Sequence, residues 1–324
     1  MKRGCVYLQY GFWQAVKKLD IGVFGPNAWD LFCVLRRNKV QVEVPLEDFN
    51  LDDLLSILWH ESGGSCFVEK GQVDAIVNGK DLSIEQLCSV FLLDKEETEC
   101  NRIARQKGIL CLNAFMLSQK KHLVNGKKES FAFKEKGSFY SLKEYLYHPC
   151  NSLIIIDPYI LKERKYINIH IKHLLANILP QTVEIPFHLS IFSSLGTNND
   201  AKAGDSYYDE ILNMLHEIRP QIEFCLTLYQ IPISGAGWHD RFVITNNLMI
   251  EASAGFECFG RVEGDIIAQK DAHFDVYSPT LSKNGDVDNY YIQINRTSRE
   301  SKTESEYYHN RFGAKENRLF DLVE

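Results

Sequence analysis

Alternating and continuous apolar stretches predict short strands and helices in the first half of the chain. Residues 42–46 alternate between apolar and polar side chains, as a strand with one buried face does, and residues 51–59 have helical spacing. Residues 109–112 form a continuous apolar run, and residues 87–93 form an apolar run that only Ser89 interrupts. The segment 95–107 between them has the polarity of a helix. A strand, a helix and a second strand in this order are typical of a βαβ unit, so we predict an α/β fold for this half.

The second half of the chain shows a clearer alternation of strands and helices. Residues 153–156 form a continuous apolar run that predicts a buried strand, while residues 183–191 and 222–228 alternate between apolar and other positions. The helical segments 163–179 and 207–218 are each closely followed by a proline, which ends a helix. Together these elements predict a mixed sheet covered by helices.

These patterns predict two units and a tail. We expect an N-terminal α/β domain of unknown role over residues 1–145, a second domain over residues 146–295 and a polar C-terminal tail over residues 296–324, in which aromatic residues such as Phe320 could dock a short last helix. The length of 324 residues agrees with two domains, since a domain takes roughly 100–200 residues. A hydrophobic fraction of 45% is enough to bury a core.

Asp94 directly follows the first of the apolar runs in the βαβ unit. Proteins with α/β folds often place reactive side chains at the carboxyl end of a strand. An aspartate in this position is also a common N-cap of the helix that follows. Since no partner motif accompanies Asp94, we interpret it as the N-cap.

Composition favours a cytoplasmic protein without a metal or another cofactor. No apolar run reaches the roughly 18 residues that span a bilayer, and the N-terminal segment lacks the apolar core of a secretory signal. The nine cysteines form no CxxC pair. Scattered cysteines in a long chain indicate reduced thiols that pack as small hydrophobic side chains, and they disfavour structural zinc.

The net charge of −7 conceals a basic segment at residues 101–150, where ten Lys and Arg residues stand against three Glu. Its basic clusters include Lys120, Lys121, Lys127 and Lys128, and aromatic residues follow them. Such a patch could contact the phosphate backbone of nucleic acid or anionic lipid headgroups. The alternative is a solvated hairpin with charged outer faces.

The strongest functional signal is the sequence WHDRFVITNN at residues 238–247. His239 and Arg241 are two residues apart on an extended segment, so both side chains point to one face and Asp240 points to the other. Arginine offers a planar set of donors that matches phosphate oxygens, and histidine can act as a nucleophile or proton-transfer group at neutral pH. By alternation Asn246 would lie on the opposite face, unless a turn at Asn246-Asn247 brings it in.

Three further residues belong to this candidate site with alternatives left open. Asp157 ends the apolar run 153–156 and either orients His239 or Arg241 or caps the following turn. Tyr159 either forms a wall of the site or belongs to the core. Trp238 could stack on a base or sugar, or be buried where the strand begins.

The segment 238–247 resembles the motif of the phospholipase D superfamily, His-x-Lys-x4-Asp followed by a Gly-Ser step. Here Arg241 stands at the lysine position, Asn246 stands at the aspartate position, and Ser253-Ala254-Gly255 replaces the Gly-Ser step. The resemblance implies metal-free phosphodiester chemistry, with His239 as the nucleophile on phosphorus and a second histidine from a matching motif as the proton donor.

Residues 153–278 more closely resemble the phospholipase D-like C-terminal domain of MIT-domain-containing proteins. The blocks that match are Asp157-Pro158-Tyr159-Ile160, His239-Asp240-Arg241, Asn246-Asn247, Met249-Ile250, Gly255 and Phe259. That family also carries asparagine at the aspartate position and is regarded as a non-catalytic, dimeric module that binds acidic phospholipid headgroups. The helical MIT hairpin has no counterpart in residues 1–150, so recognition of partners through MIT helices is not implied.

A second catalytic half is not evident in the sequence. His170-Ile171-Lys172 with Asn177 fits the motif spacing, but it lies on a predicted helix, where side chains two residues apart diverge by about 200°. His309-Asn310-Arg311-Phe312 echoes the main motif without an apolar strand around it. Catalysis would therefore require a homodimer that pairs two copies of His239.

Three functions remain open from the sequence. We expect a phospholipase D-like module that recognises a phosphate-bearing ligand, either nucleic acid or an acidic headgroup, through His239 and Arg241. The alternative is a dimeric, metal-independent phosphodiesterase or nuclease with His239 as nucleophile, and a third possibility is a structural role for the motif. By analogy we expect a prokaryotic defence or conflict setting.

Overall fold

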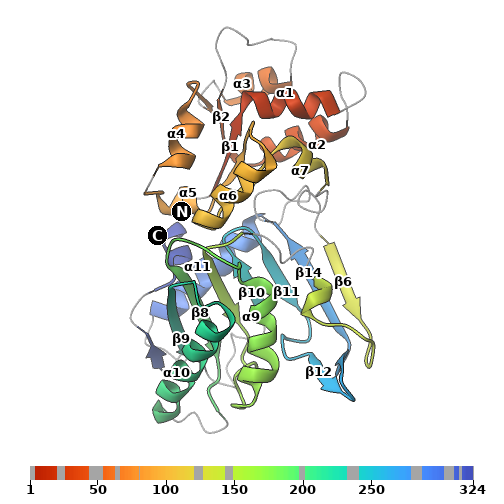
Figure 1. Cartoon of the computed structure of the whole chain (residues 1–324), viewed down its shortest axis with the longest axis vertical. Coiled ribbons are helices and arrows are strands. Elements are labelled where there is room, and N and C mark those ends of the chain that lie inside the picture. The colour runs from red at the N-terminus through yellow and green to blue at the C-terminus, as the bar shows by residue number, and fades with distance from the viewer. Residues whose placement is uncertain are drawn as a thin grey trace.

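The computed structural model describes residues 4–19, 26–43, 54–62, 66–79, 81–119, 127–142, 149–196, 201–231, 241–278, 287–302, 310–313 and 316–323. These residues form sheets flanked by helices, which confirms the expected α/β fold class. Figure 1 shows two units along the long axis of the molecule, each built around its own sheet.

The first unit is built on a five-stranded sheet of order β3-β2-β1-β4-β5, in which all pairs are parallel. Its strands are β1 (Cys5–Gln9), β2 (Lys39–Glu43), β3 (Phe67–Val68), β4 (Val90–Leu92) and β5 (Leu110–Leu112). Its helices are α1 (Tyr10–Leu19), α2 (Pro26–Leu35), α3 (Leu54–Ser62), α4 (Gln72–Asn78), α5 (Ile84–Leu87), α6 (Glu97–Lys107) and α7 (Ala114–Gln119). The predicted βαβ unit is formed by β4, α6 and β5. Every residue of these two strands is buried, as expected for a parallel sheet covered on both faces.

The second unit is built on an eight-stranded mixed sheet of order β15-β9-β8-β7-β10-β11-β14-β6. Its strands are β6 (Lys127–Phe131), β7 (Ser152–Ile156), β8 (Phe187–Ser193), β9 (Phe224–Gln230), β10 (Phe242–Thr245), β11 (Met249–Ala252), β14 (Ala272–Tyr277) and β15 (Asn310–Phe312). The strands β7, β8 and β9 are parallel, and the other pairs are antiparallel. A separate hairpin consists of β12 (Phe259–Val262) and β13 (Asp265–Ala268).

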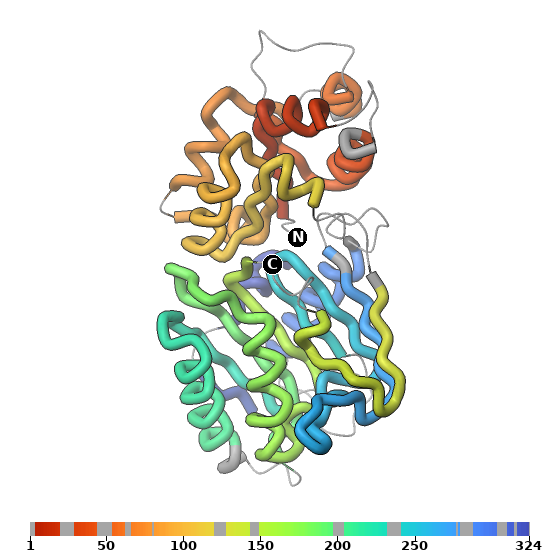
Figure 2. Tube along the Cα trace, turned by 45° about the vertical axis from the view of Figure 1, so that its right-hand side comes forward, coloured from red at the N-terminus to blue at the C-terminus, as the bar shows by residue number. Residues whose placement is uncertain are grey.

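Helices cover both faces of the eight-stranded sheet (Figures 1 and 2). They are η3 (Phe139–Leu142), η4 (Ile167–Ile171), α9 (Lys172–Ile178), α10 (Ala201–Ile218), α11 (Val287–Lys302) and η5 (Arg318–Leu322). Leu153 and Ile155 of β7 share one buried cluster with side chains of α9 and α10. Ile154 and Ile156 point to the other face and pack in a cluster with α11 and η5, because successive side chains of a strand alternate between faces.

Two parts of the expected domain organisation differ from the structure. The strand β6 pairs with β14 of the second sheet, so the residues from 127 onward belong to the second unit although we expected the boundary near residue 145. The segment 296–324 is not simply a polar tail, because α11 extends to Lys302, β15 pairs with β9, and Phe320 is fully buried. Among its described residues, Leu319, Phe320 and Leu322 of η5 are buried in the cluster that contains Ile154 and Ile156 of β7, so a short last helix docks there.

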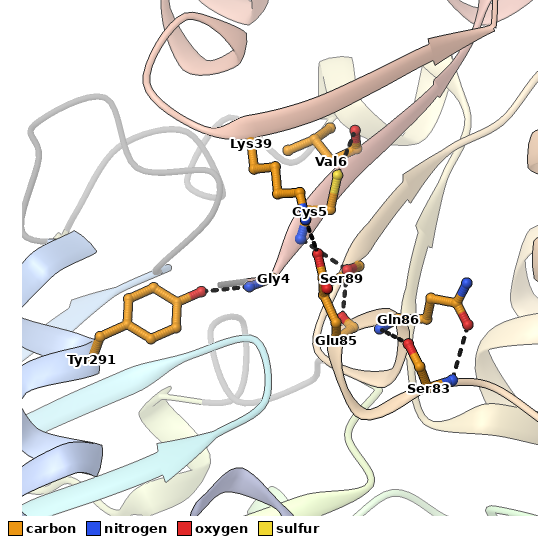
Figure 3. Close-up of polar contacts among 9 residues, drawn as sticks. All are labelled: Gly4, Cys5, Val6, Lys39, Ser83, Glu85, Gln86, Ser89 and Tyr291. Atoms are coloured by element: carbon orange, nitrogen blue, oxygen red, sulfur yellow. Dashed lines mark hydrogen bonds and ion pairs between the residues drawn. The ribbon is translucent and has the colours of Figure 1, made fainter. Parts of the chain in front are cut away.

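The amino end of β1 lies at the junction between the two units, where Figure 3 shows its polar contacts. The Gly4 amide donates to the Tyr291 hydroxyl of α11 at 2.8 Å, and the Cys5 amide donates to Ser89 Oγ at 2.8 Å. Ser89 Oγ in turn donates to the Glu85 carbonyl at 2.6 Å, and Lys39 forms an ion pair with the Glu85 carboxylate. The carboxyl ends of the first sheet therefore face away from the second unit.

Candidate functional site

The candidate site lies where β7 ends and β10 begins. Phe242 pairs with Ile156 in the antiparallel ladder, so Arg241 and Asp157, the next residues outward, lie side by side. On the other side of Asp157, its amide donates to the Phe192 carbonyl of β8 at 3.0 Å. The register thus brings together two residues that are far apart in the sequence and that the sequence singled out independently.

Asp157 is fully buried, and both of its carboxylate oxygens accept backbone hydrogen bonds. Oδ1 accepts from the Tyr159 amide at 2.9 Å, and Oδ2 accepts from the Phe256 amide at 2.7 Å. Burial, and secondarily the nearby Glu257 carboxylate, raise the pKa of Asp157 to about 7, although the two amides and Arg241 favour the charged form. Asp157 therefore both caps the turn after β7 and stands beside Arg241, so the two alternatives left open by the sequence coexist.

Arg241 is half-buried and is held from two sides. Its Nη1 donates to the Ser253 carbonyl at 3.0 Å, and its guanidinium carbon lies 5.4 Å from the centroid of the Tyr159 ring. A guanidinium over an aromatic face gains a cation–π attraction and loses conformational freedom. Tyr159 is itself half-buried, so it forms a wall of the site beneath Arg241 rather than a fully buried core residue.

Glu257 and Lys270 complete the site and were not anticipated from the sequence. Lys270 Nζ contacts Glu257 Oε1 at 2.6 Å. Gly255 lies between Glu257 and Arg241 and has a φ of +85°. If Gly255 carried a β-carbon, that atom would lie 2.4 Å from Glu257 Oε2 and 3.0 Å from both Arg241 Cδ and Asp157 Oδ2. Only glycine allows this approach, and Gly255 in the Ser-Ala-Gly step was the one sequence signal that pointed to this loop. Below, the candidate site means Asp157, Tyr159, Arg241, Glu257 and Lys270.

Asn246 lies at the opposite end of β10 from Arg241, although we expected it in the site. The turn at Asn246-Asn247 leads into β11 and does not bring Asn246 back toward Arg241. Asn246 is buried at the junction, where its Nδ2 donates to the Leu87 carbonyl at 3.0 Å and to the Gly108 carbonyl at 3.1 Å. Its Oδ1 accepts from the Asn151 amide at 3.0 Å. The side chain of Asn246 thus ties the second unit to the first.

Several expected site residues fall outside the described residues. They are Trp238, His239, Asp240, Lys120 and Lys121, and for Lys127 only the backbone, in β6, is described. Lys128 of β6 forms an ion pair with Asp275 at 3.3 Å, and Lys136 forms one with Asp265 at 2.7 Å. The part of the basic segment that the structure describes therefore mixes both signs of charge, as a solvated hairpin does.

Asp94 is not the N-cap of α6, contrary to our interpretation. That position is taken by Glu96, whose side chain makes no capping hydrogen bond. The Asp94 amide donates to Gln9 Oε1 at 2.8 Å, and its carboxylate lies against Gly11 in the first turn of α1. The reason is geometric: β1 and β4 are neighbours, so the end of β4 meets the start of the helix that follows β1.

The two histidine motifs weighed as a second catalytic half do not form one within the described residues. His170 is buried on the π-helical turn η4, where its ring stacks edge-on against Tyr166, with ring centroids 4.7 Å apart, and burial lowers its pKa. His309 lies outside the described residues. His273, on β14 next to the edge strand β6, contacts Ser130 Oγ of β6 through its Nδ1 at 2.8 Å.

The described part of the chain contains no group of three or more His, Cys, Asp or Glu side chains arranged to hold a metal ion. All nine cysteines are free thiols, and seven of them are buried. Burial raises the pKa of several of these thiols, including Cys5 to about 12, so they are unreactive packing residues.

Among the helices in the described ranges, none combines the length and apolar character needed to cross a membrane.

Comparison with known proteins adds no identification. No protein-family model matches the chain, and no curated protein matches it either. The resemblance to phospholipase D-like domains therefore stays a prediction from the motif residues.

Proposed function

We propose that the second unit recognises a phosphate-bearing ligand, nucleic acid or an acidic headgroup, through Arg241 together with His239. The observation that carries this proposal is the way Arg241 is held just before β10. Its guanidinium lies over the Tyr159 ring and donates to the Ser253 carbonyl. A guanidinium fixed in this way is preorganised for a phosphate, because little side-chain entropy remains to be lost on binding. Lys270 lies in the same site, where it is paired with Glu257 at 2.6 Å.

Binding measurements on Arg241 variants test the proposal. Labelled single- and double-stranded oligonucleotides and vesicles containing phosphatidic acid serve as probes, with EDTA present. Arg241→Ala should weaken binding by about 1.5–3 kcal/mol, the value of a charge-assisted hydrogen bond. Arg241→Lys should recover only part of the loss, because a lysine lacks the planar fork of donors. Arg261→Ala, which removes an exposed arginine from β12, is the matched control and should leave binding unchanged. Equal affinities for the wild type and Arg241→Ala would contradict the proposal.

A metal-independent phosphodiesterase, acting as a homodimer through His239, is the second candidate. It is favoured by the raised pKa of Asp157, about 7, because groups that titrate near neutral pH concentrate at catalytic sites. Cleavage of DNA or RNA in EDTA by the wild type, lost in His239→Ala, would support this function. Binding without cleavage would favour the recognition module. The defence setting stays an expectation from analogy.

A further inference from the structure

The candidate site contains two buried polar atoms of opposite hydrogen-bonding character that have no partner among the described residues. One is the donor Arg241 Nε and the other is the acceptor Glu257 Oε2. A buried donor or acceptor left without a partner is costly, so proteins retain few of them. When two such atoms lie close together, a ligand that reaches them and supplies both missing partners gains from each.

The two atoms belong to the same small region. Arg241 Cδ, which is bonded to Nε, and Glu257 Oε2 both lie within 3.0 Å of the point where a β-carbon on Gly255 would be. Glu257 Oε1 is paired with Lys270 Nζ at 2.6 Å, which leaves Oε2 as the oxygen without a partner. The region reaches the surface, because Arg241 and Glu257 are half-buried and Ser253 between them is exposed.

The character of these atoms restricts the ligand. Arg241 Nε needs an acceptor such as a phosphate oxygen, whereas Glu257 Oε2 needs a donor such as a hydroxyl group. A ribonucleotide carries both within one unit, since its 2′-hydroxyl lies beside its 3′-phosphate, and a deoxyribonucleotide lacks the hydroxyl. We propose, on the basis of the proposed phosphate recognition, that the site prefers RNA to DNA, with Arg241 on the phosphate and Glu257 on the neighbouring 2′-hydroxyl.

The surroundings of the site favour a polynucleotide over a membrane surface. Residues 157–166 and 241–258 contain no large apolar side chain that is exposed, and on the flanking elements η4 and β12 only Ile169 and Val262 of the described residues are of this kind. A protein that docks on a bilayer usually inserts such side chains at the interface. The exposed partners here are polar, and the aromatic group present, Tyr159, lies under the guanidinium, where it stiffens Arg241.

Binding to matched oligonucleotides tests this preference. The probes are single-stranded RNA, DNA of the same base sequence, and the same RNA with 2′-O-methyl groups, each measured by fluorescence anisotropy in EDTA. The wild type should bind RNA about tenfold more tightly than DNA, the factor that corresponds to about 1.4 kcal/mol. The 2′-O-methyl strand should bind like DNA, because the methyl group removes the donor and leaves the phosphate intact. This comparison needs no variant and so does not depend on the folding of one.

The Glu257→Gln variant provides the second arm. It keeps the shape of the side chain, and because Lys270 holds the one remaining oxygen, the amide nitrogen takes the place of Oε2 and the acceptor is lost. The ratio of RNA affinity to DNA affinity should therefore fall toward one. Glu223→Gln, an exposed glutamate just before β9, is the matched control and should keep the preference.

Equal affinities of the wild type for RNA, DNA and the methylated strand would overturn the RNA preference and leave phosphate recognition standing. Binding to phosphatidic acid vesicles but to none of the strands would also overturn it, with the proposed function intact. If neither strands nor vesicles bind, the proposed function itself fails, and the preference fails with it.

Discussion

Replacement of Asn246 by aspartate tests whether this residue belongs to the junction or to the candidate site. Asn246→Asp introduces the residue that stands at this position of the phospholipase D motif that the segment resembles. If Asn246 acted in the site, the substitution would improve activity at little cost in stability. The structure instead places its amide group at the junction, where Nδ2 donates to two backbone carbonyls, those of Leu87 and Gly108.

The size of the effect follows from the hydrogen bonds that are lost. Each of the two Nδ2 bonds contributes about 1 kcal/mol, and the new carboxyl oxygen would face two carbonyl oxygens in a buried place. Both carbonyls keep a bond from Asn151 Nδ2, so they are not left without a donor. We therefore expect Asn246→Asp to lower the free energy of unfolding by about 2–4 kcal/mol at neutral pH.

The dependence of this loss on pH has a definite sign. Burial would raise the pKa of the new carboxyl group above its value of about 3.9 in the unfolded chain. The protonated form can donate one hydrogen bond to a carbonyl, so stability is best retained below pH 4. It is lost progressively as the pH rises toward the folded-state pKa.

Urea unfolding measures this effect with two probes, since the variant alters a contact between two units. Far-UV circular dichroism follows both units, and tryptophan fluorescence follows mainly the first, which contains Trp13, Trp29 and Trp59. Asn213→Asp is the control, because Asn213 is exposed on α10 and should change stability by no more than about 0.5 kcal/mol. If Asn246→Asp is as stable as this control at pH 7, the structural assignment of Asn246 is refuted.

Two further predictions concern buried charged groups. Arg219 is buried, and its guanidinium donates to four backbone carbonyls, those of Pro180, Ile218, Ala176 and Leu179. Arg219→Ala should therefore lower the free energy of unfolding by about 2–4 kcal/mol. Arg219→Lys should recover less than half of this loss. An unchanged urea midpoint in Arg219→Ala would contradict this role. Because the pKa of Asp157 is raised to about 7, its contribution to stability is present below about pH 4 and is lost as the pH rises toward 7. Asp157→Asn should flatten this part of the pH–stability curve, and identical curves for the two proteins would show that Asp157 does not titrate there.

Local sequence patterns were sufficient for most of the secondary structure. The continuous apolar run at residues 153–156 and the alternation at 222–228 predicted strands that the structure contains as β7 and β9. Side chains that alternate or repeat with a helical period must have a buried face, whatever element lies opposite. The sequence also singled out Asp157, as a polar residue that ends an apolar run, and Arg241, by its spacing of two residues from His239.

The assembly of the candidate site depended on contacts that no local pattern encodes. The register of β7 on β10 placed Asp157 beside Arg241. The loop after β11 brought in Glu257, and the turn between β13 and β14 brought in Lys270, although both look like ordinary surface charges in the sequence. Asn246 shows the opposite case, since its motif position suggested the site and the direction of β10 carried it to the junction.

The sequence by itself determined the α/β class and the positions of the main strands, because burial of apolar side chains acts along each segment. Tertiary structure alone decided that β6 joins the second sheet, that the C-terminal segment packs as α11, β15 and η5, and which charged groups meet at Arg241. Pairing between distant strands depends on the summed burial and hydrogen bonding of the whole sheet, which no single segment specifies.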